Sequence, residues 1–257
     1  MSTAYKACCY CAAVVSLAVY SASANASFIV SGTVDGLDVA AEAEFAIDGG
    51  DPDLLVLTLS NTLDVAMTGR AQTLVGLLFT INGADPDLML TSATGTVDYD
   101  GNSDAFPGTP NTDLLTTDIG NGIGPPHWQF ASNLGGELSS VATFEYGLSS
   151  IGGSASGYTG IWSGGDLDGD PWGIVSQATN VDAAPFTTGA ATKPRWVRET
   201  ATFVFSGFDG LALSDIDSTV RFMFGSEPNG TIDTPEPAGL VLALLAVTLV
   251  APFRRRR

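Results

Sequence analysis

The sequence predicts an all-β protein, a β-sandwich of the jelly-roll-like or immunoglobulin-like kind. Short runs rich in aliphatic, aromatic and β-branched residues alternate with Gly, Asp, Asn and Pro. Between residues 27 and 230, no segment keeps a convincing helical period over 11 or more residues. This body is about 200 residues long, which suits one all-β domain.

The first predicted strands form a hairpin. Phe28–Val34 alternates between apolar and polar residues, and Leu37–Ile47 does the same with four residues on one face: Val39, Ala41, Ala43 and Phe45. The run Asp48–Asp53 (D-G-G-D-P-D) is typical of a turn. Leu54–Leu59 then places three leucines on one side, so we expect a strand pair joined by this turn.

The remaining predicted strands are separated by turn-rich stretches. They cover Thr73–Ile81, Leu88–Val97, Val141–Tyr146, Trp196–Phe205 and Thr219–Phe224. Tyr99–Pro126 is rich in Gly, Asp, Asn, Thr and Pro, and it is expected to form a long loop at one end of the sandwich. Thr231–Pro237 is expected to be a linker.

A four-residue motif, D-P-D-L, occurs at Asp51–Leu54 and again at Asp85–Leu88. Each copy follows Ile-x-Gly, and proline suits the second position of a turn. The repeat predicts two equivalent hairpin turns. A pair of carboxylates facing each other across the two turns is the functional alternative.

Residues 1–26 are expected to be a secretory signal peptide that the Sec machinery exports and signal peptidase removes. Lys6 supplies the positive charge, Ala12–Val19 is almost wholly apolar, and Ala24-Asn25-Ala26 fits the small-x-small cleavage pattern. Ser27 would then be the mature N-terminus. All three cysteines lie before the cut, so neither disulfides nor thiolate sites are expected in the mature chain.

The last part of the chain, residues 231–257, has the order of a sorting signal. Pro235-Glu236-Pro237 is followed by 16 uncharged residues, Ala238–Phe253, which as a helix would span about 24 Å. The chain closes with four arginines, which are expected to stay in the cytoplasm while the body lies outside: Arg254, Arg255, Arg256 and Arg257.

This ordered tail resembles the PEP-CTERM sorting domain. The resemblance implies recognition by an exosortase, a membrane cysteine transpeptidase-like enzyme that cleaves near the motif in bacteria that produce exopolysaccharide. The body is also similar to a family of exosortase-dependent surface proteins, over four stretches: Phe45–Thr62, Gly76–Ile81, Gly157–Ser176 and Val204–Gly225. No catalytic residues are carried over from that family.

The charge of the body is strongly negative. All 28 acidic residues lie between Asp35 and Glu236, against five basic residues there, which gives −23. Such a surface repels nucleic acid and anionic membranes, and it keeps an exported protein soluble. No nucleic-acid partner is expected.

Asp166, Asp168 and Asp170 are the candidate metal ligands. Carboxylates at alternate positions can converge on Ca²⁺, although Pro171 and Gln177 stand where an EF-hand loop needs Gly and Glu. A turn in which these side chains cap backbone amides is the alternative. No other cofactor is expected.

Trp162 and Trp172 flank this acidic turn and are the candidate ligand residues, because aromatic faces pack on sugar rings. Burial of the tryptophans in the core is the alternative. His127 is the single histidine, and without a G-x-S-x-G motif we do not expect it to be catalytic.

The sequence therefore predicts a non-enzymatic, exported protein of the cell surface or extracellular matrix, anchored by a C-terminal helix until processing. Two alternatives stay open. One is a carbohydrate-binding module or glycan-active enzyme of the exopolysaccharide matrix, and the other is a Ca²⁺-dependent adhesin.

Overall fold

The computed structural model describes residues 25–83, 86–99, 109–116, 127–132, 134, 144–151, 172–181, 184–186, 195–225 and 230–234. Within these ranges the chain forms twelve β-strands and no α-helix, which confirms the predicted all-β class. Two short 3-10 turns, η1 (Arg70–Gln72) and η4 (Leu213–Asp215), complete the regular structure of this part.

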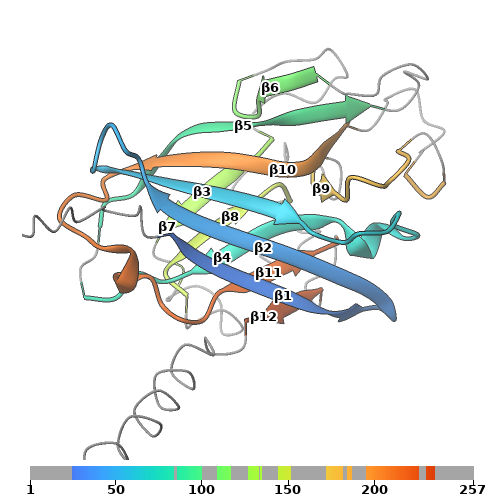
Figure 1. Cartoon of the computed structure of the whole chain (residues 1–257), viewed down its shortest axis with the longest axis horizontal. Coiled ribbons are helices and arrows are strands. Elements are labelled where there is room, and N and C mark those ends of the chain that lie inside the picture. The colour runs from blue at the N-terminus through green and yellow to red at the C-terminus, as the bar shows by residue number, and fades with distance from the viewer. Residues whose placement is uncertain are drawn as a thin grey trace, which may run out of the picture.

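The strands lie in two antiparallel layers (Figure 1). The first layer runs in the order β1 (Ala26–Val34), β2 (Leu37–Ile47), β3 (Leu54–Asn61), β10 (Arg195–Ser206), β5 (Met89–Tyr99) and β6 (Thr109–Asp113). The second runs in the order β12 (Thr231–Asp233), β11 (Arg221–Phe224), β4 (Leu74–Phe79), β8 (Tyr146–Ser149) and β7 (Gln129–Ser132).

A two-residue strand joins the layers. β9 (Ile174–Val175) pairs in parallel with β10 of the first layer and in antiparallel fashion with β4 of the second. The side-chain amide of Asn61 donates to the carbonyl oxygens of Ile174 and Gln72, each at 3.0 Å. This corner therefore holds the two layers together through backbone pairing and a buried amide.

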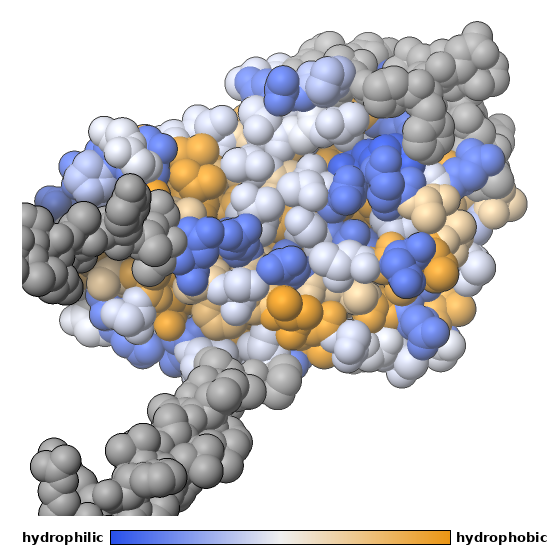
Figure 2. Space-filling view, in the orientation of Figure 1, coloured by the Kyte–Doolittle hydropathy of each residue, from blue (hydrophilic) through white to orange (hydrophobic). Residues whose placement is uncertain are grey.

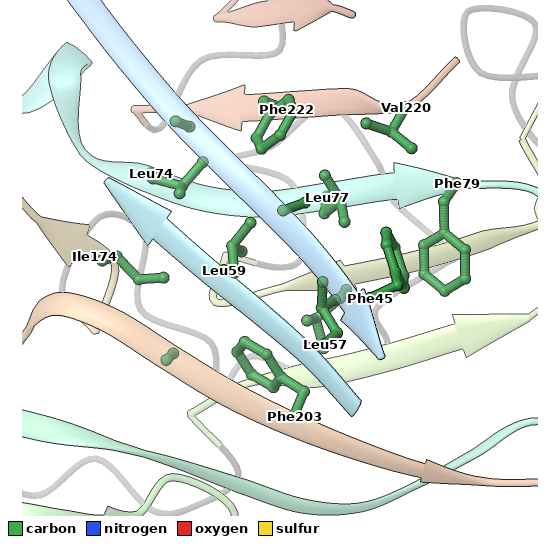
Figure 3. Close-up of a cluster of buried hydrophobic side chains, with 14 of the residues drawn as sticks. Phe45, Leu57, Leu59, Leu74, Leu77, Phe79, Ile174, Phe203, Val220 and Phe222 are labelled. Atoms are coloured by element: carbon green, nitrogen blue, oxygen red, sulfur yellow. The ribbon is translucent and has the colours of Figure 1, made fainter. Parts of the chain in front are cut away.

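Alternation along the strands produces the core. Strands such as β2, β3 and β10 turn every second side chain inward, and apolar residues from both layers meet between them (Figure 3): Phe45, Leu57, Leu59 and Phe203 from the first, and Leu74, Leu77, Phe79 and Phe222 from the second. Phe45 and Phe79 touch across the layers with ring centroids 5.3 Å apart. Full burial of one such side chain stabilises the fold by about 1.5–3 kcal/mol.

The outer face of the first layer is mixed. Thr58, Thr202 and Thr94 lie side by side on three neighbouring strands and are only partly buried. In Figure 2, apolar residues on this side of the molecule are scattered among polar ones rather than gathered in one patch. This is the pattern expected of a sheet with one face in the core and one in water.

The two layers close on each other at β1 and β12. A side-chain carbon added to Gly32 on β1 would lie 2.8 Å from Cδ1 of Ile232 on β12. Glycine at this position therefore lets the last strand approach the first.

Most predicted strands are confirmed in place, including the hairpin of β2 and β3 around Asp48–Asp53. The prediction of a second, equivalent hairpin at Asp85–Leu88 was wrong. Its described residues lead into β5, which pairs with β10 and β6, whereas the preceding strand, β4, belongs to the other layer. The same local motif thus serves a turn within a layer and a crossing between layers.

Three other boundaries differ from prediction. The predicted loop Tyr99–Pro126 contains β6, and the predicted linker Thr231–Pro237 contains β12. The strand expected at Val141–Tyr146 is found as β8, beginning at Tyr146, with residues 141–143 outside the described ranges. Local sequence does not mark these short strands because their partners supply the pairing.

The predicted signal peptide up to Ala24 and the predicted tail from Pro235 onward lie outside the described residues. Within the described ranges no helix has the length and apolar character needed to cross a membrane.

Candidate functional site

The last strand ends directly before the predicted sorting motif. β12 pairs with β11 through three residue pairs, Arg221 with Asp233, Phe222 with Ile232 and Met223 with Thr231. The guanidinium of Arg221 donates to both carboxylate oxygens of Asp233, at 2.5 and 2.9 Å, and lies 5.0 Å from the ring centre of Phe144. A bidentate pair of this kind fixes the geometry of the strand end.

Thr234 continues this attachment by one residue. Its N–H donates to the carbonyl oxygen of Val220 at 2.9 Å, and its hydroxyl accepts the N–H of Val220 at 3.0 Å. The hydroxyl also lies 3.3 Å from the carbonyl oxygen of Ser218, to which it can donate. Thr234 is only 6% exposed, so the chain is held in the fold up to the residue before Pro235.

The other end of the fold lies at the predicted signal-peptide cut. Ala26, the last residue before the cut, is the first residue of β1 and pairs with Phe45. Ser27 lies opposite Glu44, and its hydroxyl donates to the carboxylate of Glu42 at 2.7 Å. The side chain of Asn25 donates to Glu44. A cut after Ala26 would leave eight of the nine residue pairs between β1 and β2 in place.

The first D-P-D-L motif and the described part of the second, residues 86–88, come together at the end of β10. Ser206 pairs with Leu54 of β3 on one side and with Met89 of β5 on the other, so the motifs flank the same strand end. The carboxylate of Asp209 raises the pKa of Asp53 by repulsion and hydrogen bonding, with desolvation and Asp51 adding to the effect. No group of three metal-ligating side chains is found among the described residues, so this acidic rim is not assigned to a metal.

Trp172 is not on the surface. Its side chain is 1% exposed and lies flat against His127, with ring centroids 3.6 Å apart and planes 8° apart. The indole N–H of Trp128 donates to the carbonyl oxygen of Trp172 at 3.0 Å. Trp172 therefore offers no face to a sugar here, and the predicted platform is not supported at this residue. Trp128 and Trp196 are also fully buried, and His127 is buried with them.

A buried ion pair lies near the β9 corner. Arg198 forms an ion pair with Asp98, and both side chains are almost fully buried. Arg198 also donates to the carbonyl oxygens of Gln177 at 2.9 Å and Thr179 at 3.2 Å. Its inward direction comes from a bulge in β10, where Glu199 takes a left-handed φ of 61°. These contacts tie the loop after β9 to the first layer.

An uncharged groove opens on the side opposite β1 and β12, where β5 of the first layer faces β7 of the second. It encloses about 560 Å³ and is lined by Leu88, Met89, Leu90, Leu115, Trp128, Gln129, Phe130 and Ser132. This volume is in the range of small-ligand pockets. The ring of Phe130 stacks on Tyr146, with planes 7° apart, which fixes one wall.

The turn after β6 supports the other wall of this groove. The carboxylate of Asp113 accepts hydrogen bonds from the backbone N–H of Leu115 at 2.8 Å and of Thr116 at 3.3 Å. The Thr116 hydroxyl, together with these N–H groups, lowers the pKa of Asp113. The capped turn holds Leu115 at the groove.

Only some of the predicted site residues lie in the ranges that the structure describes. Asp166, Asp168, Asp170, Trp162, the sorting motif Pro235-Glu236-Pro237, the arginines Arg254–Arg257 and Ala24 lie outside the described residues. Ala26 and Trp172 are described, and they lie 146 residues apart in different parts of the fold. Sequence interpretation missed the roles of Asp233 and Thr234 in strand pairing and most of the groove residues, since these roles depend on which distant segments meet and not on a local motif.

Comparison with known proteins gave no match to a family model, to a curated protein or to a solved structure.

Proposed function

We propose that this chain is an exported protein of the cell surface or extracellular matrix, not an enzyme, whose C-terminal tail directs it to an exosortase-type enzyme and is then removed. In this proposal residues 1–26 are the signal peptide and residues from Pro235 onward are the removable tail. The tail helix, Ala238–Phe253, holds the protein in the membrane before processing, with the arginines in the cytoplasm.

One observation carries this proposal: the described strands fit between the two expected cuts. β1 loses only Ala26 to cleavage before Ser27, and cleavage after Thr234 would leave in place the three residue pairs of β12 with β11 and both hydrogen bonds between Thr234 and Val220. Removal of both ends would therefore leave both layers and the core between them intact. The finer assignment to a jelly-roll-like or immunoglobulin-like sandwich is part of the proposal, and two antiparallel layers packed face to face support it.

The test is the mass of the processed protein. The full chain would be expressed in an exosortase-positive host, and the protein from the surface and medium would be analysed by intact-mass measurement and N-terminal sequencing. We expect a chain that starts at Ser27 and lacks Ala238–Arg257. The Pro235→Ala, Pro237→Ala double variant is expected to keep its tail. A wild-type chain that keeps the tail in this material contradicts the proposal.

The groove between β5 and β7 favours a second candidate function, binding of a neutral glycan. None of the eight lining residues is charged, so the groove offers no cation to hold an acidic sugar, and the −23 carried by residues 27–236 disfavours an anionic glycan further. Apolar walls beside one amide and one hydroxyl can contact both the C–H faces and the hydroxyl groups of a sugar.

Polysaccharide pull-down with the processed protein tests this candidate. Gln129→Ala and Ser132→Ala are expected to weaken retention, whereas Gln177→Ala, at an exposed position of the loop after β9, serves as the control. Equal retention of all three variants and the wild type would place any glycan contact elsewhere on the molecule.

A further inference from the structure

The final described strand is held at every residue, and this bears on where the tail can be cut. We propose that β12 and Thr234 form a clamp that fixes the upstream limit of tail removal. The bond that is cut lies on the C-terminal side of Thr234, and the bonds before it are protected as long as the body is folded. The inference depends on the proposed function, because it takes tail removal by a processing enzyme as given.

The backbone supplies the first part of the clamp. Besides the three residue pairs with β11, Phe224 donates its N–H to the carbonyl oxygen of Gly230 at 2.6 Å, and Thr234 donates to Val220 at 2.9 Å. Enzymes that cut a chain bind it extended and engage its backbone groups, as an added strand does. A segment whose groups are already paired within a sheet must first detach, which costs free energy.

The side chains supply the second part. Asp233 is held by both nitrogens of the Arg221 fork, and Ile232 packs against the core beside Gly32. The Thr234 hydroxyl accepts the N–H of Val220, so the contact between the two residues runs in both directions. Detachment of β12 would break these contacts together and expose part of Ile232.

The sequence itself limits how this ladder can continue after Thr234. Pro235 has no N–H and so cannot donate the next bond of a ladder. In the dipeptide Thr234-Pro235, the first residue is therefore hydrogen-bonded to the body, and the second begins the sorting motif. When the tail is cut, one peptide C–N bond breaks. The carbonyl carbon bonds to water or to an acceptor amine, and the tail leaves with a protonated amine.

The first experiment measures the C-terminus of the processed protein in an exosortase-positive host. We expect the wild-type body to end at Thr234 or later. Thr234→Val keeps the shape of the side chain but removes the hydroxyl, and Asp233→Asn removes the charge that Arg221 binds. Both variants are expected to give additional products that end before residue 234. Thr202→Val and Asp64→Asn, which change the same residue types elsewhere, are the matched controls and should match the wild type.

A second experiment uses the purified full chain and a protease of broad specificity, with mass spectrometry to follow loss of β12. One hydrogen bond contributes about 1 kcal/mol, so Thr234→Val is expected to lose β12 about fivefold faster than Thr202→Val, and Asp233→Asn, whose ion pair is more exposed, is expected to lose it faster than Asp64→Asn by a smaller factor. Amide hydrogen exchange at Val220 should accelerate by a similar factor, while the exchange of Leu57 in the core stays unchanged and shows that the variant has folded.

The outcomes separate the two proposals. A wild-type body that ends before Thr234, or clamp variants that behave like their controls toward the broad protease, overturns the clamp. A tail that stays attached to every variant in the host contradicts the proposed function. In that case the broad protease and the exchange of Val220 still decide whether the clamp protects β12.

Discussion

A side-chain carbon added to Gly207 would lie 2.3 Å from the carbonyl oxygen of Asp87, and Gly207 itself has a φ of +90°. The end of β10 therefore passes against the backbone of the segment that crosses from the second layer into β5. Any residue other than glycine at position 207 would therefore place a side-chain carbon against this backbone and would have to adopt an unfavourable backbone angle.

Gly207→Ala is expected to destabilise the fold by about 2–4 kcal/mol, because strain at positive φ adds to a clash with backbone that cannot move freely. Gly210→Ala is the matched control, since Gly210 has a φ of +71° with no atom within 4 Å of the added carbon. It should cost only about 1 kcal/mol. Denaturant unfolding measures both, and similar losses for the two variants would show that the contact with Asp87 relaxes.

Asp209→Asn is expected to raise the melting temperature at neutral pH. The raised pKa of Asp53 means that the folded state binds this proton more tightly than the unfolded chain, whose aspartates titrate near 3.8. Ionised Asp53 thus lowers stability at pH above its raised pKa, and the penalty disappears as pH falls below about 3.8.

Melting curves at pH 7 and at about pH 2 check this sign, because the gain from Asp209→Asn should vanish in acid. Added salt should also reduce it by screening. Asp64→Asn, at the opposite end of β3, is the control. A variant that melts above the wild type by the same margin in acid would mean that repulsion of Asp53 is not the cause.

Replacement of Arg198 by Met should destabilise the protein by about 3–5 kcal/mol, because the carboxylate of Asp98 would stay buried without its partner. The carbonyl oxygens of Gln177 and Thr179 would also lose their donor. Arg221→Gln breaks a more exposed ion pair and is expected to cost less than about 1 kcal/mol. Equilibrium unfolding in urea compares the two, and equal losses would contradict the role of burial.

Cleavage after Ala26 would create a new positive charge at Ser27, directly opposite Glu44 and beside Glu42. This α-ammonium would take over the place of the Asn25 amide that is removed with the signal peptide. In a chain that starts at Ser27, Glu44→Gln is expected to cost about 0.2–1 kcal/mol. Acetylation of Ser27 removes its positive charge and should abolish the stability difference between the unmodified chain and its Glu44→Gln variant. A loss of stability that survives acetylation would rule out an ion pair between the N-terminus and Glu44.

Millimolar Ca²⁺ is expected to raise the melting temperature if Asp166, Asp168 and Asp170 bind it, because binding at 100 times the dissociation constant adds about 2.7 kcal/mol to the free energy of unfolding. Asp168→Ala should remove the shift, and Asp64→Ala should not. A chelator provides the metal-free reference. A wild-type melting temperature that does not respond to Ca²⁺ excludes the site, and a shift that survives Asp168→Ala places the ion elsewhere.

The strands that could be predicted are those whose own residues alternate. Val39, Ala41, Ala43 and Phe45 mark β2 by themselves, and Ala201, Phe203 and Phe205 do the same for β10. In contrast, β6 (T-P-N-T-D) contains a proline and an asparagine, and β9 and β12 are two and three residues long. Such segments become strands because β5, β10 and β11 offer free edges beside them, which no local pattern records.

The candidate sites also divide into those marked by a local sequence pattern and those formed by distant segments. The proposed tail and signal peptide are linear signals, whose prediction rests on composition and order alone, and they remain predictions because the chain up to Ala24 and from Pro235 onward lies outside the described residues. The groove depends on β5 and β7, which belong to different layers, and the inward turn of Arg198 depends on a bulge at Glu199. Both arise from how distant segments meet, so an inspection of neighbouring residues could not find them.

The strand order also places the two ends of the described fold on one side of the molecule and the groove on the other. β1 and β12, which carry the two ends of the described fold, are the outer strands on one side, whereas β6 and β7 are the outer strands on the other (Figure 1). Four or more strand spacings of about 4.8 Å separate these sides. A body tethered through β12 would therefore hold its attachment point about 20 Å from the groove, leaving that side open to whatever surrounds the cell.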